Sequence, residues 1–161
     1  MSPSARKPPP QGTVGSAHRL RANGVRVLAG RCAWRDGWQD PGMTPDPVAF
    51  AQQWVDEWNS LDLDRILAHY APDVVFRSPI AARVLPESGG VVRGIDELRR
   101  YWGTALAQVP DLRFELIDVC AGLSTLLIRF RNQLGAVRCE VLRFQDGLVV
   151  EGEGTDLVEL V

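Results

Sequence analysis

The spacing of apolar residues changes along this 161-residue chain, and each change marks a different kind of structure. Between residues 44 and 61 apolar side chains recur every three or four positions. The recurring residues are Phe50, Trp54, Trp58 and Leu61. This period predicts an amphipathic helix. Thr44 or Asp46 suits its N-cap, and Pro47 suits its first turn.

Two more helices are predicted farther along. The stretch DLDRILAHYAPD predicts a short helix with Ile66, Leu67 and Tyr70 apolar, ended by Pro72 and Asp73. The stretch IDELRRYWGTALAQVPD predicts a longer one. Its apolar face carries Ile95, Leu98, Trp102 and Leu106. Between these helices we expect a short strand in VVFRSP, a loop in IAARVLPESGG and an extended segment in VVRG.

After Pro110 the apolar period becomes two, which is typical of strands with one buried face. Tight turns at Gly122, at residues 133–135 and at Asp146-Gly147 divide this half into four strands. They are expected at about 112–121, 123–132, 136–144 and 148–156. Helices that cover one face of a curved antiparallel sheet define an α+β domain.

Glu140 does not fit the pattern of its own predicted strand. In RCEVLRFQDG it shares one face with Leu142 and Phe144, whereas Cys139, Val141 and Arg143 form the other. A buried carboxylate without a partner is costly. Three interpretations remain open: an exposed strand end, an ion pair with Arg138 or an arginine of the neighbouring strand, or an acid directed into a cavity.

Composition restricts the class of protein. The chain is 45% hydrophobic and 24% charged, as expected for one globular domain, and its net charge of −2 does not indicate nucleic acid binding. No apolar run approaches the roughly 20 residues of a membrane span. Cys32, Cys120 and Cys139 form no CxxC pair, which argues against a disulfide scaffold or zinc site and favours a cytoplasmic location.

Residues 1–42 differ from the rest. They contain seven basic and two acidic residues, a net +5, with KPPPQG and no sustained apolar period. They are interpreted as a disordered tail, or as upstream sequence translated from a start codon before the true start at Met43. A targeting peptide is less favoured because no apolar segment follows the charges. The domain is therefore placed at residues 43–161.

Three stretches carry a resemblance to a known family: WNSLDLDRILAHYAPDVVFRSP, VVRGIDELRRYWGTAL and CEVLRFQDGLVVEGEG. With the order of elements over residues 46–157, they resemble the nuclear transport factor 2-like, or SnoaL-like, superfamily. The resemblance implies a cone in which a bent sheet wraps around three helices and an apolar pocket opens at the wide end. Relatives include ketosteroid isomerase, limonene epoxide hydrolase, scytalone dehydratase, polyketide cyclases and members that only bind.

Ketosteroid isomerase provides residue-by-residue expectations. Its general base corresponds to Ser78, which lacks useful basicity and argues against that isomerisation. Its oxyanion-hole tyrosine corresponds to Trp54, which can donate a hydrogen bond through its indole N–H. Its second oxyanion donor, a neutral carboxylic acid, corresponds to Glu140. SnoaL-like cyclases can carry an acid on the last strand, which makes Asp156 a second catalytic candidate, although a solvated strand-end carboxylate is the simpler interpretation.

The remaining candidates would line the pocket. His69 and Arg77 are interpreted as ordinary helix and strand residues rather than as catalytic groups. The expected ligand-binding residues are Trp54, Trp58, Tyr70, Phe76, Ser78, Trp102 and Phe114. Such a pocket favours a small apolar or ring-bearing molecule, with the loop from Ile80 to Gly90 as a lid.

Two functions stay open. One is a ligand-binding or protein-association module without chemistry, which the missing base at Ser78 favours. The other is a cofactor-independent isomerase, hydratase or cyclase that uses Glu140 as its acid. No phosphate loop, metal-ligand motif or nucleophile triad occurs in the sequence, so no cofactor is expected.

The outer sheet face predicts a homodimer. This face should carry Thr125, Leu127, Arg129, Cys139, Val141 and Arg143. Aliphatic side chains mixed with arginines suit an isologous contact. Light scattering at tens of micromolar should therefore give the dimer mass, and Val141→Arg should give the monomer. A monomer mass for the unmodified protein would reject this interface.

Overall fold

The computed structural model describes residues 21–22, 25–26 and 45–156, within two separate units, Met1–Ala33 and Trp34–Val161. In the first unit, strand β1 (Arg21–Ala22) pairs antiparallel with β2 (Val25–Arg26). The other residues of the 1–42 segment lie outside the described ranges, as does Thr44, so the predictions made for them stay predictions. The sections below concern residues 45–156.

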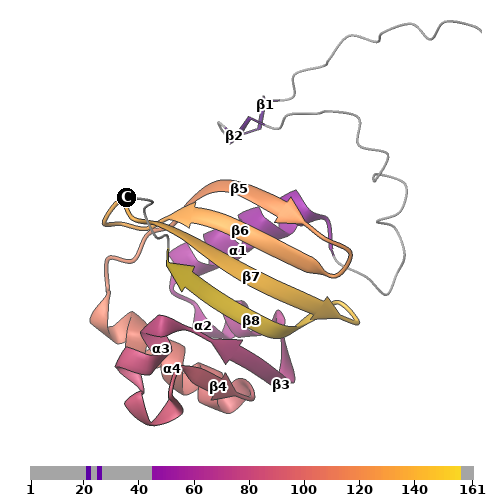
Figure 1. Ribbon diagram of the computed structural model, residues 1–161. Helices are drawn as coiled ribbons and strands as arrows, with labels where there is room; N and C mark the ends of the chain where they lie inside the picture. Colours follow the sequence, from indigo (N-terminus) through magenta and orange to yellow (C-terminus); the bar gives the residue numbers. More distant parts are fainter. Residues whose placement is uncertain (1–20, 23–24, 27–44, 157–161) are drawn as a thin grey trace, which may run out of the picture. The chain divides into compact units, whose positions relative to one another are not determined.

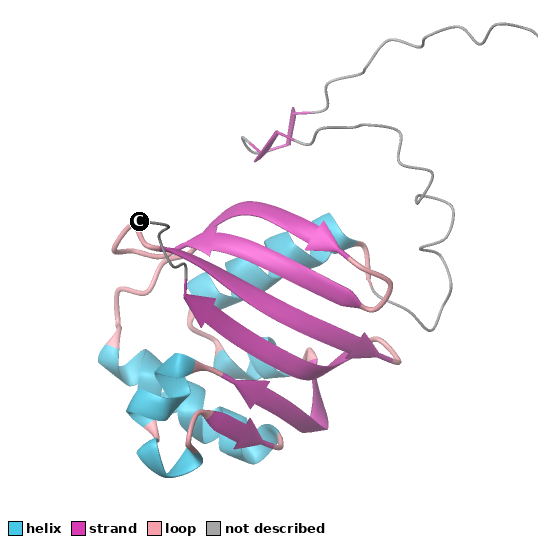
Figure 2. Cartoon of the chain, viewed as in Figure 1, coloured by secondary structure: helices cyan, strands magenta, loops and turns pink. Residues whose placement is uncertain are grey.

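A six-stranded sheet forms the centre of this second unit (Figures 1 and 2). Its strands are β3 (Tyr70–Arg77), β4 (Val91–Arg93), β5 (Glu115–Ala121), β6 (Thr125–Arg131), β7 (Val137–Gln145) and β8 (Leu148–Asp156). The spatial order is β4-β3-β8-β7-β6-β5, and the β3–β8 pair is parallel. The predicted α+β class is confirmed, but the sheet is mixed rather than wholly antiparallel.

The helices are α1 (Pro47–Ser60), α2 (Leu63–Leu67), α3 (Pro79–Val84) and α4 (Ile95–Gln108), with a 3₁₀ turn η1 (Pro86–Ser88). Asp46 caps α1 by accepting hydrogen bonds from the backbone N–H groups of Val48 and Ala49, as its residue type predicted. In Figure 1, α1 lies behind strands β5 to β7, and α3 and α4 lie beside β3 and β4. The helices therefore cover one face of the sheet.

Two local predictions are wrong. Tyr70 is not helical: α2 ends at Leu67, and Tyr70 begins β3, because Pro72 disfavours helical backbone before it. The segment after Ser78 is not a loop either. Ser78 caps α3, and Pro79 occupies its first turn. The Ser-Pro pair is therefore a helix-start signal as well as the end of a strand.

The outer sheet face has the composition that the sequence predicted. Leu127 and Val141 are partly exposed there, and Arg129 and Arg143 are exposed. Both arginines pair within the chain: Arg129 with Asp118, and Arg143 with Glu151 at 2.6 Å. Since these pairs satisfy the arginines without a partner subunit, the proposed homodimer stays a prediction.

Gly152 allows β8 to lie close to β3. It is opposite Leu142 on one side and next to Phe76 on the other. A Cβ at Gly152 would lie 2.5 Å from Phe76 Cδ2 and 2.8 Å from its Cε2, closer than atoms can pack. Phe76 is buried and its ring packs edge-on against Trp102, so it has little room to move.

We predict that Gly152→Ala destabilises the domain by about 1–3 kcal/mol, because the added methyl group displaces the Phe76 ring. Gly103→Ala is the matched control. Gly103 lies in α4 and a Cβ there would be 3.7 Å from Leu63 Cδ2, an ordinary contact, so the change should stabilise the helix by about 0.5–1 kcal/mol. Denaturant unfolding measures the change in the free energy of unfolding of each variant, and the two changes should have opposite signs. Equal changes would contradict the packing argument.

Candidate functional site

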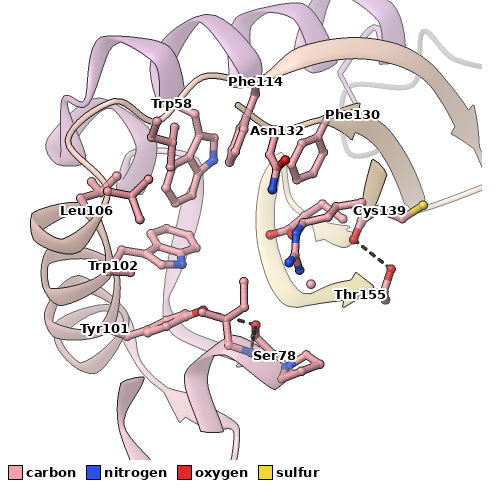
Figure 3. Close-up of a pocket in the computed structure, with 18 of the residues that line it drawn as sticks. Trp58, Ser78, Tyr101, Trp102, Leu106, Phe114, Phe130, Asn132, Cys139 and Thr155 are labelled. Carbon is pink, nitrogen blue, oxygen red and sulfur yellow. Dashed lines mark hydrogen bonds between the residues drawn. The ribbon is translucent and has the colours of Figure 1, made fainter. Parts of the chain in front are cut away.

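A pocket of about 300 Å³ opens between the helices and the sheet (Figure 3). Its walls come from α1, α3, α4, the turn between β6 and β7, and the ends of β7 and β8. Its apolar lining includes Trp54, Trp58, Phe76, Ile80, Trp102, Leu106, Phe114 and Phe130. Its polar lining includes Ser78, Arg83, Tyr101, Asn132, Gln133, Arg138, Glu140 and Thr155. Apolar groups thus form most of the pocket surface, and six of the lining side chains are Trp or Phe rings.

Glu140 lies on β7 opposite Gly154 of β8, and it is buried on the same face as Leu142 and Phe144, as strand alternation predicted. A Cβ at Gly154 would be 3.2 Å from Glu140 Oε2 and 3.4 Å from Ser78 Oγ. Both oxygens therefore border the same side-chain-free position. The parallel pairing of β3 and β8 explains this proximity, since Ser78 follows directly after β3.

The carboxyl group of Glu140 has no ion-pair partner among the described residues. Arg138, the partner that the sequence offered, pairs with Asp156 instead. Burial in the apolar pocket raises the pKa of Glu140 to about 8, because desolvation disfavours the charged form. At neutral pH the folded protein therefore holds Glu140 mainly as a neutral acid that can donate a hydrogen bond.

Ser78 and Tyr101 form a second polar pair beside Glu140. The Ser78 hydroxyl accepts from the backbone N–H of Ile80 at 3.1 Å, and the Tyr101 hydroxyl donates to it at 3.3 Å. These bonds occupy both acceptor positions of the oxygen, so its own O–H is available as a donor. Burial raises the pKa of Tyr101, and the nearby Glu140 adds to this. Ser78 thus caps α3 and also lines the pocket.

Trp54 contributes its ring rather than its N–H group. Its indole N–H donates to the Tyr70 hydroxyl at 3.4 Å, which occupies the donor that the family resemblance had assigned to a ligand. Tyr70 itself is buried and lies outside the pocket lining. Burial raises the pKa of Tyr70 well above its ordinary value. Trp54 stacks on Phe114 with ring centroids 5.9 Å apart, and so shapes the aromatic wall.

The other predicted site residues fall into two groups, those that line the pocket and those that do not. Trp58, Phe76, Trp102 and Phe114 line the pocket, as expected for the ligand-binding group. Asp156 is exposed, pairs with Arg138 and does not line the pocket. Tyr101 was missed. Its spacing of three from Leu98 on the apolar face of α4 was the signal that could have found it.

A second buried polar cluster lies outside the pocket. Glu57 of α1 is buried, with its Oε2 atom 2.5 Å from His69 Nε2. Gln53 donates to Glu57 Oε1 at 2.9 Å, and Arg65 is 3.9 Å away. His69 also packs edge-on against Phe50. These contacts tie α1 to the start of β3, and they account structurally for the buried Glu57 and the half-buried His69.

The described ranges hold neither a metal-ligand cluster nor a membrane-spanning helix. Among those residues, no group of three His, Cys, Asp or Glu side chains is arranged to hold a metal ion. No helix within the same ranges has both the length and the apolar character needed to cross a membrane. Cys120 and Cys139 carry free thiols.

Comparison with known proteins identifies the fold family. The SnoaL-like domain family matches residues 51–152. A SnoaL-like protein of unknown function from Burkholderia thailandensis is 35% identical, with a TM-score of 0.66; the alignment covers 70% of this chain and 94% of that one. Among curated proteins, none matches the sequence.

Two more distant structures share the fold. A putative polyketide cyclase from Sinorhizobium meliloti is 18% identical with a TM-score of 0.56, covering 69% of this chain and 94% of its own. TerC, crystallised with polyporic acid, is 14% identical with a TM-score of 0.57, covering 70% and 92%. The family match, the mixed sheet and its helices together show that the chain belongs to the SnoaL-like family of the nuclear transport factor 2-like superfamily.

Proposed function

We propose that this domain binds a small, apolar, ring-bearing molecule and that neutral Glu140 donates a hydrogen bond to an oxygen atom of that molecule. The observation that carries the proposal is a buried carboxyl without an ion-pair partner among the described residues, in a pocket lined by aromatic rings. A neutral acid in such surroundings is a strong donor. Ser78, on the other side of Gly154, supplies a second donor for the same ligand atom.

The pocket walls favour flat rings. Trp58 packs edge-on against Trp102, with centroids 5.0 Å apart, and is tilted against Phe114 at 5.7 Å. Such surfaces bind ring compounds through area burial and offset stacking. TerC, which has the same fold, was crystallised with polyporic acid, and this gives a fold-level analogy for a small-molecule ligand.

The second candidate is an isomerase, hydratase or cyclase that uses Glu140 as general acid without a cofactor. It is favoured by the pKa of Glu140, about 8, since such a group can exchange a proton near neutral pH. Binding without chemistry is favoured by the rest of the lining. Among the described lining residues Glu140 is the only carboxyl group, and no histidine joins it, so a separate general base is not provided.

A stability measurement tests the state of Glu140. In the unfolded chain Glu140 releases its proton near the ordinary pKa of 4.5, whereas the folded protein keeps it up to about 8. Between these values stability falls as pH rises, and the cost levels off above the folded pKa. Glu140→Gln removes this cost, so at pH 7 it should stabilise the domain by up to about 3 kcal/mol, with the gain vanishing near pH 4.

Denaturant unfolding from pH 4 to pH 9 provides this measurement. Glu153→Gln, an exposed change on β8, is the control for removing a charge and should lack the pH-dependent gain. If Glu140→Gln instead destabilises the protein at pH 7, and the loss fades in acid, Glu140 is an ion-pair partner and the proposed role is wrong.

A binding measurement tests the function itself. Fluorenone, a flat three-ring ketone without a titratable group, is a suitable probe for calorimetric titration. Its affinity should stay constant below pH 7 and fall about tenfold between pH 7 and pH 9, as Glu140 ionises and its donor is lost. In Glu140→Gln the amide remains a donor, so the profile should be flat. Absence of binding to the unmodified protein, or binding that ignores pH, would reject the proposal.

A further inference from the structure

Two buried side-chain atoms have no hydrogen-bond partner in the part of the chain that the structure describes. They are Trp58 Nε1, a donor, and Gln133 Oε1, an acceptor. Both residues line the pocket. Buried polar atoms in native proteins are nearly always paired, so an unpaired one requires an explanation. Here two such atoms of complementary type share one cavity.

The indole of Trp58 is held in place by its neighbours. Trp54, Trp102 and Phe114 all lie within 6 Å of it, centroid to centroid, and the side chain is 93% buried. In Figure 3 its nitrogen lies on the edge of the ring that faces Phe114, at one end of the pocket. Trp54 differs, since its N–H already donates to Tyr70. Trp58 therefore holds a fixed and unused donor in the pocket wall.

Gln133 lies in the turn that joins β6 and β7. Its neighbour Asn132 uses its side-chain oxygen within that turn, accepting from the backbone N–H groups of Leu134 and Ala136. The Gln133 oxygen makes no such contact. Figure 3 shows Asn132 at the same end of the pocket as Trp58, and Ser78 at the opposite end. The turn thus brings an unused acceptor to the Trp58 end.

We propose that Trp58 and Gln133 form a second polar subsite, which binds a hydroxyl group at the end of the ligand remote from Glu140. A hydroxyl group can accept a hydrogen bond from the indole N–H and donate one to the amide oxygen. The ligand is then a flat ring compound with an oxygen at each end: a carbonyl or hydroxyl at Glu140 and Ser78, and a hydroxyl at Trp58 and Gln133. This inference rests on the proposed function and narrows its ligand class.

The test compares fluorenone with its monohydroxy isomers by calorimetric titration at pH 7. The ketone occupies the Glu140 end, and the isomers place the hydroxyl at different distances from it. For the unmodified protein at least one isomer should bind about three- to tenfold more tightly than fluorenone. In Trp58→Phe, which keeps an aromatic ring but lacks the N–H, the smaller ring weakens fluorenone and its isomers alike, and the ratio of their affinities should fall to about one. Gln133→Met should reduce the gain.

Trp54→Phe is the matched control. It makes the same change on the same helix and the same pocket wall, but it removes an N–H that Tyr70 already occupies. The hydroxyl gain should therefore persist in Trp54→Phe. A gain that is absent from the unmodified protein, or that survives in Trp58→Phe, overturns the subsite. Failure of every probe to bind overturns the proposed function and the subsite with it.

Discussion

The structure of this pocket depends on one buried carboxyl group that has been separated from its possible counter-ions. Three polar side chains are buried in the described part of the chain: Glu57, Ser78 and Glu140. Glu57 has three polar partners, and Ser78 has two donors bonded to its oxygen. Glu140 has neither kind of partner there. Its desolvation is relieved by keeping the proton, which turns a costly charge into a neutral donor inside an aromatic pocket.

The last strand makes this arrangement sterically feasible. Gly152 and Gly154 occupy one face of β8, where Gly152 admits the ring of Phe76 and Gly154 leaves the space between Glu140 and Ser78. A larger residue at position 152 would clash with the ring of Phe76. A larger residue at position 154 would fill the space between the Glu140 and Ser78 oxygens. The parallel β3–β8 pairing then brings the end of β3, and with it Ser78, to the carboxyl. The site is therefore a consequence of sheet topology and two missing side chains.

Much of this could be predicted from the sequence, because periodicity is a local property. The period of two placed Glu140 on the face of Leu142 and Phe144, and helical spacing placed Trp54, Trp58 and Trp102 toward the core. The hydrogen bond from Trp54 to Tyr70, the pairing of Glu57 with His69 and the contact of Tyr101 with Ser78 could not be predicted. Each joins residues that are 12 to 23 positions apart, and only tertiary packing brings them together.

Protonation of Glu140 and ligand binding reinforce each other in such a site. A ligand that accepts a hydrogen bond from the neutral acid and excludes water from the pocket disfavours the ionised form further. By linkage, binding above pH 8 must then be accompanied by proton uptake. The lining residues that the structure describes provide donors at this end of the pocket but no second carboxyl group and no histidine as a separate base, and this is the reason that binding is proposed ahead of catalysis.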